Sequence, residues 1–135
     1  MLRSQPPVQT DFDWQQLRQL AGEDPDFECD LLAMFLKDAQ MSLDQLEQAI
    51  ATQNIQAIED AAHSLRGASA NVGACGLANA ARQLEKIARN GQLNGQLNGQ
   101  LNGQLNGQLN GNLHSLLKQL RSHHHGIQIH LAQKR

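Results

Sequence analysis

The sequence predicts an all-α protein: an antiparallel four-helix bundle with a short extra N-terminal helix and an expanded loop before the last helix. The composition is 40% hydrophobic but only 3% aromatic, so the core must be aliphatic, which favours helices over a β-sandwich. Apolar residues also recur at intervals of three and four along successive long segments. The 135 residues suit one domain with a single core.

A short helix follows a polar N-terminal lead-in. Residues 1–10 contain two prolines and no apolar run, so we expect them to be flexible. Asp11 or Asp13 can cap the helix, whose apolar residues are Phe12, Trp14, Leu17 and Leu20. Gly22 and Pro25 end it.

A much longer helix is expected to begin at Asp26, which is placed to cap it. Its apolar residues recur at intervals of three or four and are Phe27, Leu31, Phe35, Ala39, Leu43, Leu46 and Ile50. An apolar stripe of about 25 residues needs partner helices to bury it.

The next helix places a histidine opposite its apolar stripe. Asn54 is a suitable cap, and at 100° per residue the apolar side comprises Ile55, Ile58, Ala62, Leu65, Ser69 and Val72. His63 falls nearly opposite the centre of this stripe, so we expect it to face solvent. Gly73 and Gly76 then bracket a turn.

A further amphipathic helix follows this turn, and its apolar residues are Leu77, Ala80, Ala81, Leu84, Ile87 and Ala88. We expect it to stop near Asn90 and Gly91, because this pair is a common helix terminator. Arg82, Lys86 and Arg89 lie at i, i+4 and i+7 and therefore share one face. Either a solvated face or a docking surface for an acidic partner would explain this row of charges.

The tetrapeptide Gln-Leu-Asn-Gly then occurs in five consecutive copies over residues 92–111. Four residues turn a helix by about 400°, so the leucines would drift about 40° per copy and form no stripe. Each glycine adds a helix penalty of about 1 kcal/mol relative to alanine. We therefore expect a mobile linker with little helix, and a strained helical extension of the neighbouring helices is the alternative.

The last helix carries a heptad pattern formed by Leu113, Leu117, Leu120, His124, Ile127 and Leu131. His123, His124 and His125 form a cluster in it, with His114 and His130 nearby. Adjacent helical residues point about 100° apart and cannot close one tetrahedral metal site. We expect the cluster to form a solvated helix face without a bound metal.

Charge and cysteine content bear on the class of protein. The net charge of −2, from 11 Lys+Arg and 13 Asp+Glu, offers no basic field for nucleic acid. There is no apolar stretch of about 18 residues and no N-terminal signal pattern, so a soluble, cytoplasmic protein is expected. Cys29 and Cys75 are expected to be buried or half-buried free thiols in a reducing compartment.

Residues 62–73 carry the candidate chemistry. A solvent-facing histidine such as His63 keeps an imidazole nitrogen free, and a neutral imidazole is a nucleophile towards phosphorus. Arg66, one turn further along, offers a fixed cation for the oxygens of a phosphoryl group. Gly67 costs helix stability, but its missing side chain leaves room for a partner's active site to approach.

This segment resembles the histidine phosphotransfer (HPt) domain, whose motif is His-x-x-Lys-Gly followed by small residues and a further glycine. The resemblance covers most of residues 12–91 and the final helix, so residues 11–132 are expected to form one HPt-like bundle to which only the repeat is foreign. It implies a phosphorelay intermediate without kinase activity, which takes a phosphoryl group from one receiver-domain aspartate and gives it to another receiver. His63 would be the phosphoacceptor and Gly67 the access residue.

Two positions differ from the family pattern. Arg66 stands where lysine is more frequent; it keeps the charge but is bulkier and forked, so transfer rate or partner preference is expected to differ. Some members of the family place a glutamine near the histidine from the neighbouring helix. By counting, this chain has Glu85 there, so that role is not transferred to it.

The resemblance also implies the partners. Receiver domains or a hybrid histidine kinase would dock on the faces around the histidine, on Glu59, Asp60, Ala70, Arg82 and Lys86. Glu59 and Asp60 could also orient or electrostatically tune the imidazole. The chain is expected to be a monomer and to need no cofactor or metal, because the receiver brings Mg²⁺. Two alternatives stay open: an HPt-type substrate domain phosphorylated in trans by a histidine kinase, and a non-catalytic helical interaction module.

Overall fold

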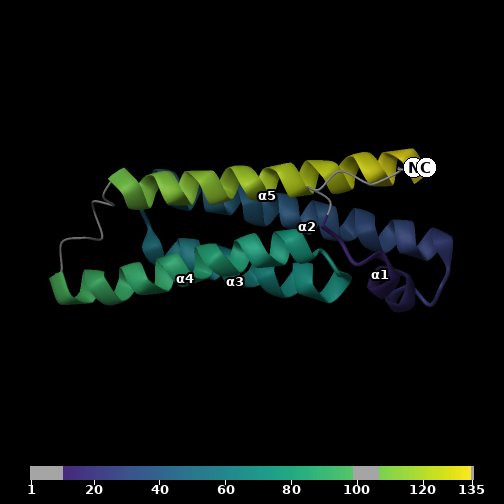
Figure 1. Ribbon diagram of the computed structural model, residues 1–135, viewed down its shortest axis with the longest axis horizontal. Helices are drawn as coiled ribbons and strands as arrows, with labels where there is room; N and C mark the ends of the chain where they lie inside the picture. The colour runs from purple at the N-terminus through teal and green to yellow at the C-terminus, as the bar shows by residue number, and fades with distance from the viewer. Residues whose placement is uncertain (1–10, 99–106, 135) are drawn as a thin grey trace, which may run out of the picture.

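The part of the chain that the structure describes consists of four long helices and one short helix. The computed structural model describes residues 11–98 and 107–134. Its helices are α1 (Trp14–Leu20), α2 (Pro25–Ala51), α3 (Ile55–Val72), α4 (Cys75–Asn98) and α5 (Gly107–Lys134). The long helices run lengthwise and α1 lies at one end of the bundle (Figure 1). This arrangement confirms the predicted all-α bundle with a short N-terminal helix.

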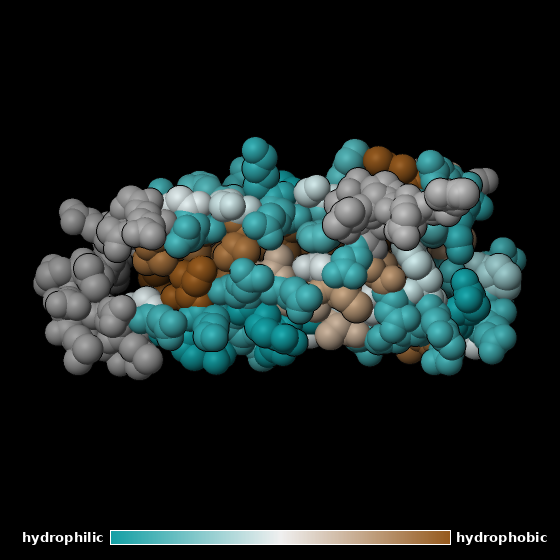
Figure 2. Space-filling view, viewed as in Figure 1, coloured by the Kyte–Doolittle hydropathy of each residue, from teal (hydrophilic) through white to brown (hydrophobic). Residues whose placement is uncertain are grey.

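The four long helices enclose one aliphatic core. α3 packs against α2 and α4, and α5 closes the ring by packing against α2 and α4. Figure 2 shows apolar side chains in the furrow between α5 and α4, while mostly polar side chains flank it on the face in view. Burying a leucine contributes about 1.5–3 kcal/mol, so the shared core holds the helices together. Its fully buried residues include Leu32, Leu43, Leu46, Ile58, Leu65, Leu77, Leu84, Leu113 and Leu120.

The buried side of α2 differs from the predicted stripe in its first turn. Glu28 turns inward there, whereas Phe27 is 46% exposed. Lys134 at the end of α5 compensates the buried carboxylate, because its Nζ donates to Glu28 Oε2 at 3.0 Å. The predicted inward position of Phe27 is therefore wrong, while the positions of Leu43 and Leu46 are confirmed.

The helices begin at short polar side chains. Asp13 caps α1 and Asn54 caps α3, as predicted, each accepting a hydrogen bond from a backbone N–H at 3.1 Å. The cap of α2 is Asp24 and not Asp26, because Pro25 occupies the first helical position, where its missing N–H costs nothing. Asp24 Oδ1 instead accepts from the backbone N–H of Asp26 at 3.0 Å.

The N-terminal segment clasps the turn between α3 and α4. The backbone N–H of Asp13 donates to the carbonyl of Gly73 at 2.7 Å. Gly73 ends α3 with φ of +94°, and a Cβ there would lie 2.6 Å from the Asp13 carbonyl oxygen. The Gln16 side chain donates to the carbonyls of Ala70 and Asn71 at 2.8 and 3.0 Å. These bonds satisfy carbonyls that the end of a helix leaves unpaired.

The repeat is helical at both of its ends. α4 continues past Gly91 to Asn98, and α5 begins at Gly107. The prediction of a linker with little helix is therefore wrong for residues 92–98 and 107–111, and the alternative of a helical extension holds there. A nucleated helix gains one hydrogen bond for each residue added, and glutamine and leucine favour helix enough to continue it. Residues 99–106 lie outside the described residues, as does the lead-in predicted at residues 1–10.

The histidines of α5 do not form a uniformly solvated face. His124 is buried, and its Nε2 lies 2.9 Å from the carbonyl oxygen of Leu36. The ring of His123 packs against Gly76, where an added Cβ would collide with it. His125 is exposed, as predicted. The heptad pattern thus turns His124 inward, which corrects the prediction for this residue.

The two cysteines differ in their environment. Cys29 is half-buried, as predicted, whereas Cys75, the first residue of α4, is exposed, so the prediction that it is buried or half-buried is wrong. Within residues 11–98 and 107–134, no group of three or more His, Cys, Asp or Glu side chains is arranged to hold a metal ion. None of the helices described there is both long and apolar enough to cross a membrane.

Candidate functional site

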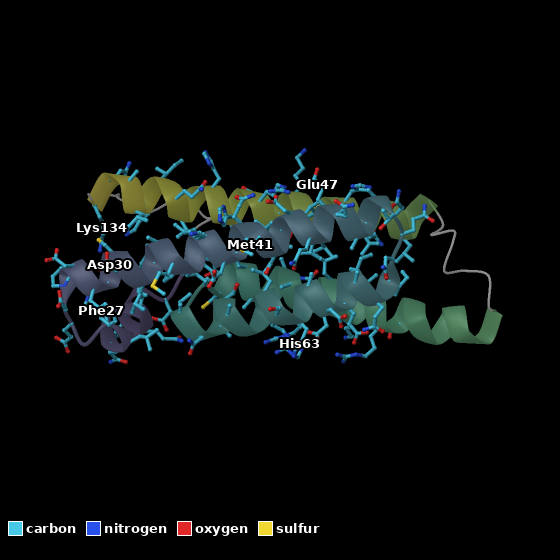
Figure 3. The ribbon with its side chains drawn as sticks, turned by 180° about the vertical axis from the view of Figure 1, so that it is seen from behind. Phe27, Asp30, Met41, Glu47, His63 and Lys134 are labelled. Carbon is cyan, nitrogen blue, oxygen red and sulfur yellow. The ribbon has the colours of Figure 1, made fainter. Side chains whose placement is uncertain are left out.

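His63 lies in the middle of α3 on its solvent face. Its sequence neighbours Ala62 and Leu65 lie on the opposite side of the helix and are buried in the core. The imidazole is 66% exposed, and Figure 3 shows it at the outer edge of the bundle. The predicted solvent-facing position is confirmed, so a reactant can reach this ring from outside.

Glu85 of α4 fixes the ring. Its Oε2 lies 2.7 Å from Nδ1 of His63, and its side chain is only 5% exposed. An ionised carboxylate can only accept hydrogen bonds, so Nδ1 carries the proton and donates it. In the neutral imidazole the other ring nitrogen, Nε2, then has the lone pair and is the nucleophilic atom.

Arg66 connects the histidine and the carboxylate. Its Nε donates to Glu85 Oε1 at 2.6 Å, and its Nη2 lies 3.1 Å from His63 Nδ1. Neither the guanidinium nor a protonated Nδ1 can accept a hydrogen bond. The contact between Arg66 and the ring therefore brings a positive charge close to the imidazole without a hydrogen bond between them. The fork has five N–H donors, so it can still bind an incoming anion.

Arg89 completes the surroundings of the carboxylate. Its Nη2 donates to Glu85 Oε2 at 2.9 Å, and its Nε donates to Glu59 Oε2 at 3.1 Å. Burial tends to raise the pKa of Glu85, but hydrogen bonds from Arg66 and His63, together with their charges, hold it below its ordinary value. Glu85 is therefore a buried anion at neutral pH.

Gly67 leaves the surface beside His63 open. A Cβ added to this glycine would meet no atom within 4 Å. Packing inside the chain therefore does not require a glycine here, although glycine in a helix costs about 1 kcal/mol relative to alanine. The geometry agrees with a role in the approach of a partner.

The other predicted site residues are distributed around the histidine. Glu59 faces Arg89, whereas Asp60 accepts from Gln56 Nε2 at 2.8 Å and lines a groove between α2 and α3. Because Glu59 pairs with Arg89 and Asp60 pairs with Gln56, the structure does not show the two carboxylates acting together on the ring. Three further residues are exposed, namely Ala70 near the end of α3 and Arg82 and Lys86 on α4.

Sequence reasoning missed the contacts of Glu85 and Arg89. Counting along the helix had placed Glu85 near the histidine, but it assigned no role to this residue. Arg89 was taken only as one of three cations on a helix face, although the structure shows it bound to two carboxylates. The signal for both was the spacing of Glu85 and Arg89 at i and i+4 on the helix that follows the histidine.

Comparison with known proteins agrees with this geometry. The family model of the Hpt domain matches residues 30–123. A solved structure, the histidine-containing phosphotransfer protein B (HptB) from Pseudomonas aeruginosa PAO1, is 28% identical with a TM-score of 0.71. The match covers 91% of this chain and 92% of that chain. No curated protein matches the chain.

The chain therefore belongs to the Hpt domain family, which performs histidine phosphotransfer in two-component signalling. The family model includes α3, α4 and most of α2 and α5. The resemblance inferred from the histidine motif is confirmed.

Proposed function

We propose that this protein is a phosphorelay intermediate, which accepts a phosphoryl group on Nε2 of His63 from a receiver-domain aspartate and passes it to another receiver. The observation that carries the proposal is the bond between His63 Nδ1 and buried Glu85 at 2.7 Å on a ring that is 66% exposed. In the neutral ring this bond leaves the lone pair on Nε2. The relationship to a histidine-containing phosphotransfer protein supports it.

The reaction at His63 is a displacement at phosphorus. The lone pair of Nε2 forms a P–N bond, while the P–O bond of the aspartyl phosphate breaks and its electron pair returns to the carboxylate. Arg66 has N–H donors left for the phosphoryl oxygens, although Glu85 holds its Nε. Mg²⁺ bound to the receiver would supply further charge stabilisation. The chain itself needs neither a cofactor nor kinase activity for this step.

The docking surface in this proposal surrounds the exposed imidazole. Gly67 leaves space beside it, and Ala70 adds a small exposed residue on the same helix. Arg82 and Lys86 on α4 present exposed positive charge to an acidic receiver surface. Asp60 and Glu59 border the surface on the other side. We further propose that the protein acts as a monomer in the cytoplasm, where receiver domains would meet it.

Phosphoryl transfer from a phosphorylated receiver domain tests the proposal. The wild type is expected to take up acid-labile, base-stable phosphate, whereas His63→Gln takes up none. His125→Gln is the matched control, because it removes another exposed helical histidine and should leave uptake unchanged. Uptake that persists in His63→Gln would overturn the proposal.

A second arm replaces the receiver with a histidine kinase core and ATP. The phosphorelay intermediate is expected to accept phosphate readily from the receiver. If only the kinase core loads His63, the chain is a substrate domain, and the proposed transfer from receiver to receiver is wrong.

A further inference from the structure

The group that accepts from His63 Nδ1 is the negatively charged carboxylate of Glu85, although a neutral acceptor would be enough to fix the ring. We infer that Glu85, held by Arg66 and Arg89, keeps Nδ1 of phosphorylated His63 protonated and thereby makes the phosphoryl group short-lived and easily transferred. Glu85 is thus a positioning residue that sets the lifetime of the phosphorylated state. The inference rests on the proposed function, because it concerns the phosphorylated form of the same histidine.

The carboxylate of Glu85 is fixed in place on both oxygens. Oε1 accepts from Arg66 Nε at 2.6 Å, and Oε2 accepts from Arg89 Nη2 at 2.9 Å as well as from His63. The side chain is buried, so water does not compete for these oxygens. Glu85 cannot turn away from the ring without giving up charged hydrogen bonds.

The charged groups that face the ring come from two helices. α3 contributes Arg66, and α4 contributes Glu85 with its partner Arg89, which also binds Glu59 of α3. The charges pair with one another, but the carboxylate is nearer to Nδ1, at 2.7 Å against 3.1 Å for Arg66 Nη2. The Glu85 carboxylate is therefore the charged group closest to Nδ1 and to the proton that this nitrogen carries.

The contact between Nδ1 and Glu85 matters most after His63 has accepted the phosphoryl group. Phosphorylation at Nε2 leaves a proton on Nδ1 and a positive charge on the ring. If that proton stays, breaking the P–N bond returns the electron pair to Nε2 and releases neutral imidazole. If the proton is lost to water, the same bond must release an imidazolate anion, which is a much poorer leaving group. A carboxylate that retains the proton therefore speeds loss of the phosphoryl group to an aspartate or to water.

The lifetime of the phosphorylated protein tests the inference. Wild type and Glu85→Gln are loaded with phosphoramidate, a small phosphoryl donor, and the first-order release of inorganic phosphate is followed from about pH 5 to pH 9. Near neutral pH, the wild type is expected to release phosphate about tenfold faster than the variant. The pH above which release slows is expected to lie about one unit higher in the wild type, which corresponds to that tenfold difference.

Glu28→Gln is the matched control. Glu28 is also a buried carboxylate with a charged partner, Lys134 at 3.0 Å, but it lies on α2 at the end of the bundle where α1 lies. The control should release phosphate at the wild-type rate even if it lowers stability. Circular dichroism verifies that each variant is folded.

A second measurement uses the wild type alone. The ¹⁵N chemical shifts of phosphorylated His63 are expected to show a protonated Nδ1 at about pH 8. An unprotonated Nδ1, or equal release rates with the same pH profile in wild type and folded Glu85→Gln, would overturn the inference. The proposed function would survive that outcome, because it requires only that His63 is loaded. It fails separately if His63→Gln is loaded as well as the wild type.

Discussion

Arg66 and Glu85 form a hydrogen-bonded ion pair beside His63. Both positions differ from the pattern of the resemblance, and the structure shows that they are in direct contact. A carboxylate can accept from Arg66, Arg89 and His63 together, whereas a glutamine would turn its NH₂ group towards one of these donors. The arginine and the carboxylate therefore form one charged pair beside the histidine.

The sequence predicted the orientation of His63 and Gly67 because the helical period determines which side of its own helix a residue occupies. The contacts of Glu85 and Arg89 depend on a different quantity, namely the register of α4 against α3. That register is set by how the side chains of two helices interlock. The pattern within one helix does not contain this register. The sequence therefore predicted the positions of Glu85 and Arg89 on their own helix but not their contacts with other side chains.

Gly67→Ala separates helix stability from access to the histidine. No atom of the chain lies within 4 Å of the new Cβ, so alanine should raise the free energy of unfolding by about 0.5–1 kcal/mol. Transfer from a phosphorylated receiver should nevertheless slow several-fold, because the methyl group occupies the approach beside His63. Denaturant unfolding and rapid-quench transfer kinetics measure the two effects.

Gly111→Ala is the control for this substitution. Gly111 is helical and also has nothing within 4 Å of an added Cβ. It should stabilise the protein by a similar amount and leave transfer unchanged. Wild-type transfer rates in Gly67→Ala would show that the glycine is not needed for access.

At the scale of whole elements, the starts of two helices could be predicted because their caps are local. Asp13 and Asn54 cap their helices through local hydrogen bonds, which the local sequence contains. The inward side of α2 was misplaced in its first turn because the partner of Glu28, Lys134, lies far along the chain. Likewise, the inward turn of His124 depends on the carbonyl of Leu36 in another helix.

The docking of the N-terminal segment on α5 depends on His130. Trp14 stacks between Phe12 and His130, with ring centroids 4.0 and 3.9 Å apart. Burial lowers the pKa of His130 and Lys134 lowers it further, while Glu28 opposes this effect. The folded protein therefore binds fewer protons here than the unfolded chain. The neutral His130 ring therefore contributes its full stabilisation of the folded state above the ordinary pKa of 6.5. This stabilisation is lost as the pH falls through the lowered pKa of His130 in the folded protein.

Acidification should consequently loosen this contact. Trp14 is the only tryptophan in the sequence, so its fluorescence reports on the stack. We expect the emission of the wild type to change as the pH falls below 6.5, and His130→Phe to abolish this change because phenylalanine does not titrate. His125→Phe, at an exposed position, should behave like the wild type. A wild-type titration in His130→Phe would rule out His130 as its source.

At the scale of the whole molecule, the sequence predicted the number and order of the helices because four apolar stripes must bury one another. It did not predict how far α4 and α5 extend into the repeat. Helix propensity disfavoured the repeat, but the prediction treated it as an isolated segment. In the folded chain it joins two helices that are already formed, and helix propagation requires much less than nucleation.

Shortening the repeat should change stability little. Removing residues 92–103, three of the five copies, keeps Leu109, which packs against the core, and leaves Ala88 and Leu113 in place. Loop closure entropy changes by only about 0.6 kcal/mol for each doubling of length. The free energy of unfolding, measured in denaturant, should therefore stay within about 1 kcal/mol of the wild type. A loss of several kcal/mol would show that the removed copies contribute packed structure.

The clasp at the N-terminus determines the shortest useful version of this protein. The family match spans residues 30–123, yet Gln16 of α1 holds the end of the helix that carries His63. The stack of Trp14 on His130 also lies wholly outside that span. A fragment cut at the family boundaries would lose these contacts and the Glu28 ion pair with Lys134. Affinity tags and fusion partners should therefore be attached before Asp11 or after Lys134.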